Sequence, residues 1–442
     1  MVTTPYKEIV LETNTRQLPA GKNFLDVYIL YRVKNKIKNC KNDNHRGTSH
    51  DALPIYLSES ALPRLFHCLY GETHSHTFYT SDQVEFGASI QATAKLAKAM
   101  GLDFYCATDH SYDLDDRPDN YLSVDPELKK WHLFQQEVTT FNNNNTDFII
   151  LAGEEVTIRN SQDKNVHCLI YNSKKFYPGS GDGAERWLHN RSELTLERLL
   201  SSVSDDALVF AAHPTVKPPF LQKIFLNRGQ WQKIDCVSER LNGLQFINNG
   251  GLKEVEQGKK FWIELLLRGF QLIAIAGNDA HGNFARFRQI GFPFFTMREN
   301  YKHLFGKWRT GIYVKHKCNP SNILDALKQG HSFMTNGPAL SLRALVNRRW
   351  LPMGGTYRNI KKFKVDVKST LEFSQISHVI IYSGYIGDRK EQILLEIEKF
   401  EDKLHHVFEL DFKAVPKDGY VRAEVYTING LQALSNPIWF LK

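Results

Sequence analysis

Short apolar runs recur through the middle of the chain, and several are separated by segments with helical periodicity. The runs are residues 65–70, 104–107, 148–152, 168–171, 208–212, 244–247 and 272–276. Helical patterns cover residues 83–100, 126–141, 193–203 and 253–270, and Gly101 ends the first of them. Short apolar runs predict buried strands, whereas apolar positions three or four residues apart predict helices.

The alternation of strand and helix predicts an α/β fold of parallel strands joined by right-handed crossovers. Seven such strands in about 270 residues match the usual size of a barrel of the (β/α) type. We therefore expect residues 65–338 to form a TIM-like barrel.

The C-terminal part, residues 339–442, has a different pattern. Its apolar runs are short and bounded by turn residues such as Gly384 and Gly419, and they cover residues 363–367, 376–382, 393–397, 406–412 and 420–426. This pattern predicts an accessory antiparallel β-sandwich.

The N-terminal segment, residues 1–64, contains one strand candidate, residues 24–33, and then a polar, lysine-rich stretch over residues 34–51. The polar stretch is typical of a solvated loop. Because chain termini often lie close together, we expect the N-terminal strand to join the C-terminal sandwich.

Composition indicates an ordinary globular protein, with 42% hydrophobic and 24% charged residues. The net charge of +8 is modest for 442 residues, and no basic groove interleaved with aromatics favours nucleic-acid binding. The six cysteines form no CxxC pair, as is usual in a reducing compartment. No apolar run approaches the roughly 18 residues of a membrane span, and the first residues do not resemble a signal peptide. We therefore expect a cytoplasmic protein; its oligomeric state is not indicated.

Histidines and carboxylates recur at the edges of the predicted strands. In chain order they are His74 and His76, Asp109 and His110, Glu154 and Glu155, His167, His213, and Asp279 and His281. A barrel builds its active site at one rim, from the ends of several strands. These side chains are therefore predicted to meet at one rim.

Two of these pairs have a spacing of two residues, His74 with His76 and Asp279 with His281. On extended backbone both members of such a pair point to the same face. One pair alone is weak support among 17 histidines, so the recurrence at successive strand ends carries the prediction. The remaining histidines show no such placement: His45, His50, His67, His132, His189, His303, His316, His331, His378, His405 and His406.

Imidazoles mixed with carboxylates suit Zn, Mn or Fe(II), whereas Ca and Mg prefer oxygen ligands and structural zinc sites usually include thiolates. Roughly eight or nine candidate ligands exceed what one ion needs, so two or three divalent ions are expected, with a carboxylate such as Glu155 placed to bridge. The implied reaction is hydrolysis with a metal hydroxide as the nucleophile. The sequence contains no G-x-S-x-G elbow, Walker loop or dinucleotide fingerprint that would indicate another chemistry.

The ordered motifs HxH, TDH, GxE, His, AHP and G-x-D-x-H resemble those of the PHP (polymerase and histidinol phosphatase) superfamily of metal-dependent hydrolases, over residues 65–338. The resemblance implies a distorted (β/α)7 barrel, up to three metal ions and, most commonly, phosphoester hydrolysis. It also implies the ligands His74, His76, His110, Glu155, His167, His213, Asp279 and His281. Asp82 corresponds to the acidic ligand of the family's SDG segment, although Gln83 replaces the glycine here and the spacing from His76 is one residue longer. Glu155 is chosen over Glu154 because the family glutamate is the second residue after the glycine.

Two further segments, residues 330–338 and 435–439, look like the CehA/McbA branch, the carbaryl-hydrolase-like metallohydrolases. This second resemblance extends through the sandwich and implies ester or carbamate hydrolysis.

Other residues near the ligand motifs are candidates for supporting roles. Asp109 and His281 are candidate catalytic residues, and Asp109 is expected to orient its neighbours or His110 by hydrogen bonding. Arg159, Lys217 and Arg286 closely follow ligand motifs and are candidates for binding a phosphate.

The favoured function is hydrolysis of a small-molecule phosphomonoester or phosphodiester. The alternative is a carbamate or carboxylic ester hydrolase, which the same cluster would serve; cations around the pocket favour a phosphoester, and an apolar cleft favours a neutral carbamate. An alternative of another class is a non-catalytic, metal-containing binding module. The large ligand set argues against it, because a structural site needs only about four ligands.

Overall fold

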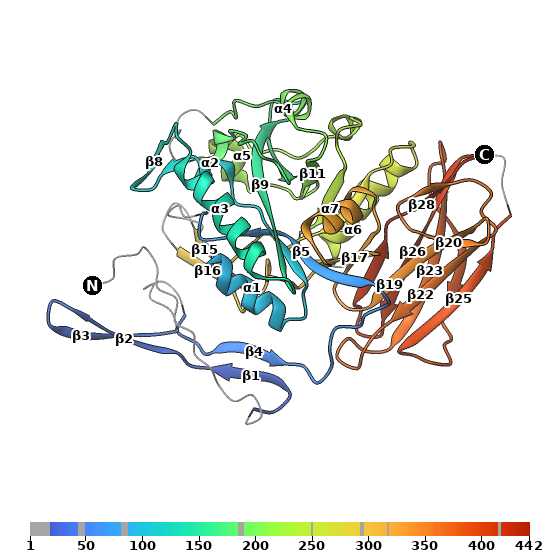
Figure 1. Cartoon of the computed structure of the whole chain (residues 1–442), viewed down its shortest axis with the longest axis horizontal. Coiled ribbons are helices and arrows are strands. Elements are labelled where there is room, and N and C mark those ends of the chain that lie inside the picture. Colours follow the sequence, from blue (N-terminus) through green and yellow to red (C-terminus); the bar gives the residue numbers. More distant parts are fainter. Residues whose placement is uncertain are drawn as a thin grey trace.

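A computed structural model describes residues 18–42, 49–80, 87–183, 190–248, 251–291, 296–315, 318–413 and 417–442, with side chains described outside residues 288–298. The chain is mixed α/β and rich in sheet. Figure 1 shows a curled sheet with helices packed around it, a β-sandwich at the C-terminal end and an extended N-terminal arm.

The curled sheet is part of a sheet of 16 strands, and seven consecutive members follow the chain in order. They are β5 (Cys68–His76), β6 (Phe104–Ala107), β9 (Ile149–Arg159), β10 (Asn165–Tyr171), β11 (Leu208–Ala212), β12 (Gly243–Ile247) and β13 (Ile273–Ala276). Each overlaps one of the seven apolar runs, so all seven predicted strands are confirmed. Strand β5 begins later than predicted and continues through His76.

The pairing of these strands differs from the expected parallel order at one position. Strands β5, β6 and β9 pair in parallel, as do β11, β12 and β13. Strand β10 is antiparallel to both of its neighbours, β9 and β11. Only residues 160–164 connect β9 to β10, and such a short link allows a hairpin but no helical crossover.

Helices occupy all four predicted positions: α1 (Ile90–Ala99), α3 (Lys129–Asn144), α4 (Leu196–Ser202) and α6 (Leu252–Leu266). The described residues also contain α2 (Ser111–Leu114), α5 (Phe220–Phe225), α7 (Pro320–Lys328), and the 3₁₀ helices η2 (Ser180–Asp182) and η4 (Lys233–Cys236). Helix α1 begins where the Ser89 side chain accepts a hydrogen bond from the Ala92 amide, and the left-handed Gly101 follows its end, as predicted. None of the helices in the described residues is long and apolar enough to span a membrane.

The large sheet continues beyond β5 into the sandwich. The order of strands is β17 (Arg309–Tyr313), β18 (Ser332–Thr335), β27 (Gln432–Ser435), β26 (Gly419–Thr427), β23 (Ile376–Tyr385) and β24 (Gln392–Ile397), with β14 (Ala280–His281), β21 (Thr356–Tyr357) and β28 (Ile438–Phe440) off this path. The opposing sheet contains β20 (Arg349–Pro352), β19 (Ala339–Val346), β22 (Lys362–Lys368) and β25 (His405–Asp411). All five predicted sandwich strands are confirmed.

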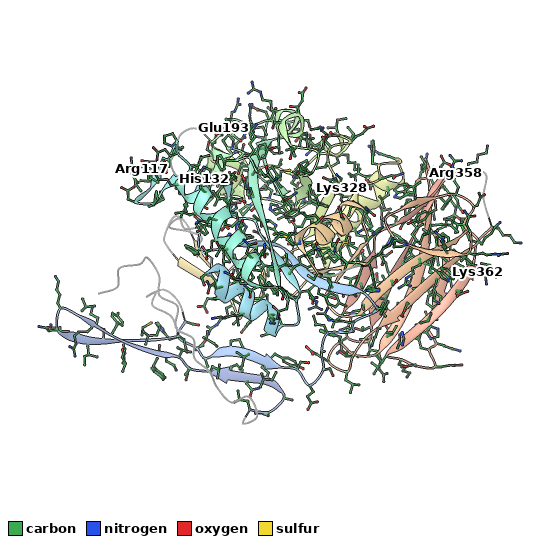
Figure 2. The ribbon with its side chains drawn as sticks, in the orientation of Figure 1. Arg117, His132, Glu193, Lys328, Arg358 and Lys362 are labelled. Carbon is green, nitrogen blue, oxygen red and sulfur yellow. The ribbon has the colours of Figure 1, made fainter. Side chains whose placement is uncertain are left out.

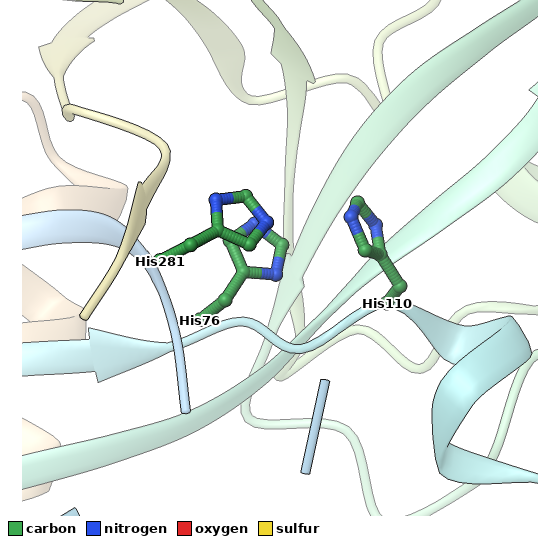
Figure 3. A group of neighbouring side chains, drawn as sticks. All are labelled: His76, His110 and His281. Atoms are coloured by element: carbon green, nitrogen blue, oxygen red, sulfur yellow. The ribbon is translucent and has the colours of Figure 1, made fainter. Parts of the chain in front are cut away.

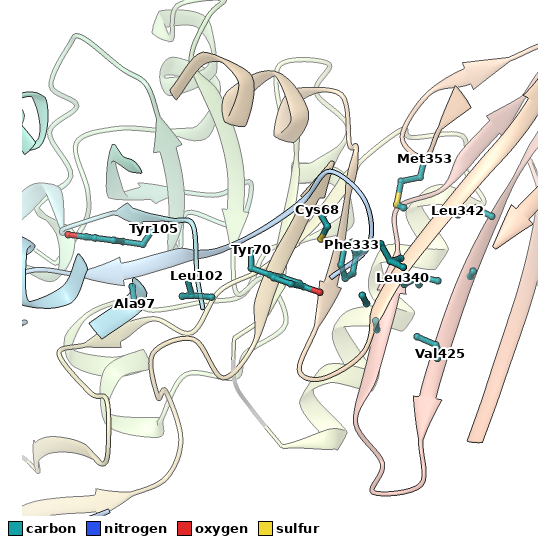
Figure 4. Packing of buried hydrophobic residues seen from close by; sticks show 14 of the residues in the cluster. Cys68, Tyr70, Ala97, Leu102, Tyr105, Phe333, Leu340, Leu342, Met353 and Val425 are labelled. Atoms are coloured by element: carbon teal, nitrogen blue, oxygen red, sulfur yellow. The ribbon is translucent and has the colours of Figure 1, made fainter. Parts of the chain in front are cut away.

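One hydrophobic core runs from the curled sheet into the sandwich. Figure 4 shows Tyr70 beside Phe333, followed by Leu340 and Val425, and all four side chains are buried. Burying an aliphatic or phenylalanine side chain of this size contributes about 1.5–3 kcal/mol. The division at residue 338 therefore separates two patterns of secondary structure but not two cores.

Side chains, rather than another strand, satisfy the outer edge of β13. The amide of the fully buried Asn436 accepts a hydrogen bond from the Ala274 N–H (2.7 Å) and donates one to the Ala274 carbonyl oxygen (2.9 Å). Thr310 Oγ1 bonds both backbone groups of Ala276 at 2.9 Å. Thr73, on β5, also donates to the Ala276 carbonyl oxygen (2.8 Å). The two ends of the curled sheet, β13 and β5, are thus held together by side-chain hydrogen bonds.

The N-terminal segment differs from expectation. Strand β1 (Gly21–Leu25) pairs with β4 (Leu53–Leu57), and β2 (Tyr28–Val33) pairs with β3 (Lys36–Lys41). The expected strand over residues 24–33 is therefore two strands, and the expected loop contains β3. Lys34 and Asn35 both adopt positive φ, the geometry of a tight hairpin turn that returns the chain at once. For the described strands, the prediction that this segment joins the sandwich is wrong, because each pairs within the segment.

Two short ribbons complete the described strands: β7 (Asp116–Arg117) with β8 (Asn120–Val124), and β15 (Phe287–Gly291) with β16 (Thr296–Asn300).

Replacing Asn436 with alanine should destabilise the whole protein, because two buried backbone groups of Ala274 lose their partners. At about 1–3 kcal/mol for each buried unsatisfied group, we expect the free energy of unfolding to fall by about 2–6 kcal/mol. Urea unfolding followed by tryptophan fluorescence measures the change. The exposed Asn429→Ala substitution is the control and should stay within about 0.5 kcal/mol of the unsubstituted protein. Equal effects of the two substitutions would contradict this account of the edge.

Candidate metal centre

The predicted ligands lie together at one rim of the curled sheet. His74 and His76 come from β5, His110 directly precedes α2, and Glu155 and His167 lie on the adjacent strands β9 and β10. The other three follow β11 and β13: His213, Asp279 and His281. Apart from Asp82, which lies outside the described residues, every ligand implied by the resemblance is at this rim.

The carboxylate of Glu155 is at the centre of the group. Its Oε2 lies 3.2 Å from each of three imidazole nitrogens, His74 Nε2, His76 Nε2 and His110 Nδ1. Its Oε1 lies 2.6 Å from His167 Nδ1 and 3.0 Å from His213 Nε2. One fully buried carboxylate is thus shared by five imidazoles from four different segments.

Asp279 provides a second carboxylate, more open to solvent. Its Oδ1 lies 3.1 Å from His76 Nε2 and 3.5 Å from His74 Nε2. Strand β14 pairs in parallel with β5 and brings His281 beside His76. Figure 3 shows these two rings stacked, with His110 facing them; the centroids of the stacked rings are 4.0 Å apart.

The backbone is strained where two of these residues enter the site. His213 and Asp279 have φ angles of 32° and 53°, in the left-handed region that non-glycine residues rarely adopt. Such conformations cost about 1–3 kcal/mol each and persist where surrounding structure enforces them, often at functional sites. Gly277 permits the close approach of this loop, because a Cβ there would lie 2.5 Å from His74 Cβ.

These side chains form groups that can hold metal ions. Three sets have ligand atoms within 4.8 Å of one another: His76, His110 and His281; His74, His76, Glu155 and Asp279; and His110, Glu155 and His167. Glu155 Oε2 and His74 Nε2 are buried and make no hydrogen bond within the described residues. Buried polar atoms are normally hydrogen-bonded, so these orphaned atoms fit a role as metal ligands.

The strand alternation separates Glu154 from Glu155. Neighbouring strand residues point to opposite faces, and Glu154 accepts hydrogen bonds from Trp131 Nε1 (2.9 Å) and the Tyr177 amide (3.3 Å). Burial there raises the pKa of Glu154 to about 8. Glu155 alone faces the histidines, in agreement with the choice made from the resemblance.

Asp109 supports the loop that follows β5. Its carboxylate accepts hydrogen bonds from the Thr77 amide (2.7 Å), the Thr77 hydroxyl (2.8 Å) and the Thr80 amide (2.9 Å). The Thr80 hydroxyl lies 3.3 Å from His76 Nδ1. Asp109 therefore orients its neighbours in the loop after β5, which is one of the two roles expected for it. Its oxygens point to this loop and not to the histidine cluster.

Opposite charges within the cluster offset the free-energy cost of burying its carboxylates and imidazoles. Burial alone would raise the pKa of Glu155, but the surrounding His167, His74 and His110 hold the pKa well below its usual value. Burial and His281 act to lower the pKa of His76, but Asp279 and Glu155 raise it to about 9. In the absence of metal, the site therefore favours anionic carboxylates and protonated imidazole.

A pocket of about 210 Å³ opens beside the cluster. Its lining includes His167, His213, Asp279 and His281 from the ligand set, together with Lys217 and Arg228. Lys217, the candidate that follows His213 in the sequence, therefore lies at this pocket, and its role in substrate binding stays a prediction.

The other two expected substrate-binding residues face elsewhere. Arg159 donates to the Ser192 carbonyl oxygen (2.8 Å) and pairs with Asp163 (2.6 Å), because the short β9–β10 hairpin turns it toward its own loop. Arg286 donates to the Ser49 hydroxyl (2.6 Å) and to the carbonyl oxygen of residue 51 (2.5 Å), so it anchors the N-terminal segment. Neither is among the described residues that line the pocket. In this structure both side chains are therefore held away from the pocket, and the expected placement at the site is not observed.

Four residues at the site were not predicted from the sequence. Gln245 Oε1 accepts a hydrogen bond from the His213 amide (3.0 Å) and lies 3.3 Å from His74 Nδ1. Arg228 and His303 line the pocket, and Asp182 bonds to His167. Only Asp182 carries a sequence signal, its place in the glycine-rich stretch 179–183, whereas Gln245 is hidden inside an apolar run.

The chain matches no protein-family model, and a comparison with curated proteins finds no match either.

The metal-free protein should lose stability as the pH rises from about 6.5 to about 9. The folded state raises the pKa of His76 to about 9, so its protonated form stabilises the fold. That contribution is complete below the unfolded value near 6.5 and is lost as the pH passes through the folded value. Thermal unfolding of chelator-treated protein across this range measures the slope.

The His76→Gln substitution should flatten this slope, whereas His132→Gln should leave it unchanged. Figure 2 shows His132 at the periphery of the molecule, on α3, where it is exposed. Added Mn or Zn should stabilise the protein more at high pH, because imidazoles bind metal in their neutral form. A slope that His76→Gln does not alter would contradict the assigned charge state.

Proposed function

We propose that this protein is a metal-dependent phosphoesterase and that its curled sheet is a distorted (β/α)7 barrel of the PHP type. The observation that carries the proposal is the carboxylate of Glu155, which is shared by five imidazoles beside a pocket lined by two cations. Such a ligand set exceeds the needs of a closed structural site, and its open side faces the pocket.

Two or three divalent ions, Zn, Mn or Fe, would be held by the residues at the rim. The residues that would hold them form two groups that share Glu155, one with His74, His76 and Asp279 and one with His110 and His167. Bound ions of this kind polarise a phosphoryl oxygen and activate a water for attack. The mixture of imidazoles and carboxylates fits these metals better than Ca or Mg.

The protein's own residues orient the ligands and receive the substrate. A hydrogen bond to one ring nitrogen can fix each of three histidines. His74 Nδ1 lies 3.3 Å from Gln245, His76 Nδ1 lies 3.3 Å from Thr80, and His281 Nδ1 lies 3.1 Å from the Asp279 carbonyl oxygen. This leaves the opposite nitrogen of each ring for metal or proton transfer. Lys217 and Arg228 place positive charge where an anionic substrate would enter.

A carbamate or carboxylic ester is the second candidate substrate, because the pocket lining includes apolar side chains. These side chains can accommodate an aryl leaving group: Val216, Pro218, Pro219, Trp231 and Phe287. The charges at the pocket favour the phosphoester, because a neutral carbamate gains nothing from two cations.

Metal binding is the first prediction to test. We expect the purified protein to contain two or three equivalents of Mn, Zn or Fe, measured by inductively coupled plasma mass spectrometry. His74→Ala and Glu155→Gln should each lower the metal content by at least one equivalent, because each removes a ligand. His132→Ala should retain the full content. A folded, unsubstituted protein that binds no metal would refute the proposal.

Turnover of three chromogenic substrates tests the reaction class. With Mn or Zn supplied, a phosphomonoester or phosphodiester should be hydrolysed, and His74→Ala should lower the rate at least about a hundredfold. The His132→Ala variant should keep its activity. Turnover of a naphthyl carbamate alone would replace the phosphoesterase with the second candidate. A fully metal-loaded protein that hydrolyses none of the three would favour a binding module without catalysis.

A further inference from the structure

A buried carboxylate connects a histidine of the cluster to an arginine of the pocket. Asp182 Oδ2 accepts a hydrogen bond from His167 Nε2 (2.9 Å) and pairs with Arg228 Nη1. The Asp182 side chain is 5% exposed, and its other oxygen, Oδ1, makes no hydrogen bond within the described residues. Asp182 therefore contacts both the metal centre and the substrate pocket without belonging to the implied ligand set.

On the cluster side, the two nitrogens of His167 face two carboxylates. Nδ1 lies 2.6 Å from Glu155 Oε1, at the centre of the candidate site, and Nε2 faces Asp182. A histidine that binds metal through Nδ1 carries its proton on Nε2. A carboxylate that accepts this proton fixes the ring orientation and makes the ligating nitrogen more basic.

On the pocket side, the same carboxylate holds a guanidinium at the wall. Arg228 lines the pocket with a fifth of its side chain exposed (20%), and its Nη1 and His167 Nε2 are neighbouring donors that share Asp182 Oδ2 as acceptor. A guanidinium has five N–H donors in a planar fork that matches two oxygens of a phosphoryl group. The pair with Asp182 keeps this fork next to the cluster.

We propose that Asp182 is a positioning residue that acts in both directions: it orients His167 within the metal centre, and it holds Arg228 where the guanidinium binds a phosphate-type anion of the substrate. The inference rests on the proposed phosphoesterase function and names the residue that recognises its anionic group. Arg228 is then a specificity-determining residue, and Lys217, on an exposed part of the pocket wall, is a weaker contributor.

The experiment measures metal affinity and binding of inorganic phosphate, so neither readout depends on turnover. Metal affinity is measured by competition with a chromophoric chelator, and phosphate affinity by calorimetry on Mn-loaded protein. The variants are Arg228→Met, Arg228→Lys and Asp182→Asn, which preserve side-chain size. The matched controls are Arg240→Met and Asp205→Asn, which break an arginine–aspartate pair of 2.6 Å on the surface outside the pocket.

Arg228→Met should weaken phosphate binding about 10- to 100-fold with unchanged metal affinity, because a charge-assisted hydrogen bond is lost. Arg228→Lys should recover only part of this loss, because lysine lacks the fork. Asp182→Asn should weaken metal binding about 10- to 100-fold and should also weaken phosphate binding. Both control variants should match the unsubstituted protein.

The possible outcomes separate this inference from the proposed function. Phosphate affinity that is unchanged in Arg228→Met, or absent from the unsubstituted protein, overturns the role of Arg228. Unchanged metal affinity in Asp182→Asn overturns the role of Asp182. Phosphoester turnover combined with either result refutes the inference and leaves the proposed function in place. If the expected binding changes occur but no phosphoester is hydrolysed, the proposed function is refuted and the roles of Asp182 and Arg228 in binding remain in place.

Discussion

The site depends on one buried carboxylate. Removing a charged carboxylate from water costs several kcal/mol unless charges and hydrogen bonds compensate. Five imidazoles surround Glu155, and they come from strands and loops that are far apart in the sequence. Each segment must therefore reach the same point in space before the carboxylate is stabilised. This requirement links the shape of the sheet to the chemistry of its rim.

The strained residues at the rim also depend on the surrounding fold. His213 holds an unfavourable backbone angle immediately after β11, and Asp279 does so three residues after β13. Hydrogen bonds from Gln245 to the His213 amide and from the Asp279 amide to the His74 carbonyl oxygen hold these turns in place. The buried interior thus supplies the free energy that keeps these two residues in a conformation which the local sequence does not prefer.

The sequence predicted the parts of the protein in which local pattern and tertiary structure agree. The seven strands and the residues at their ends were recognisable because each candidate ligand lies within a few positions of the edge of an apolar run. The antiparallel β10 was not predicted, because apolar periodicity carries no strand direction; only the short link of residues 160–164 hints at it. Arg159 and Arg286 were misplaced because proximity in sequence does not fix the direction of a long side chain. Asp182 and Arg228 reach the site from loops whose course depends on the whole fold.

The side-chain amide of Asn436 constrains how this protein can evolve. It replaces a neighbouring strand at the edge of β13, and Phe333 of β18 pairs with Ser435 of β27 just beside it. The sandwich therefore belongs to the same sheet that carries the candidate site, and it is not a separate module attached to it. Recombination that exchanged one half for a foreign one would have to preserve both partners of this contact. We therefore expect the two halves to be inherited together and to diversify through the loops around the pocket.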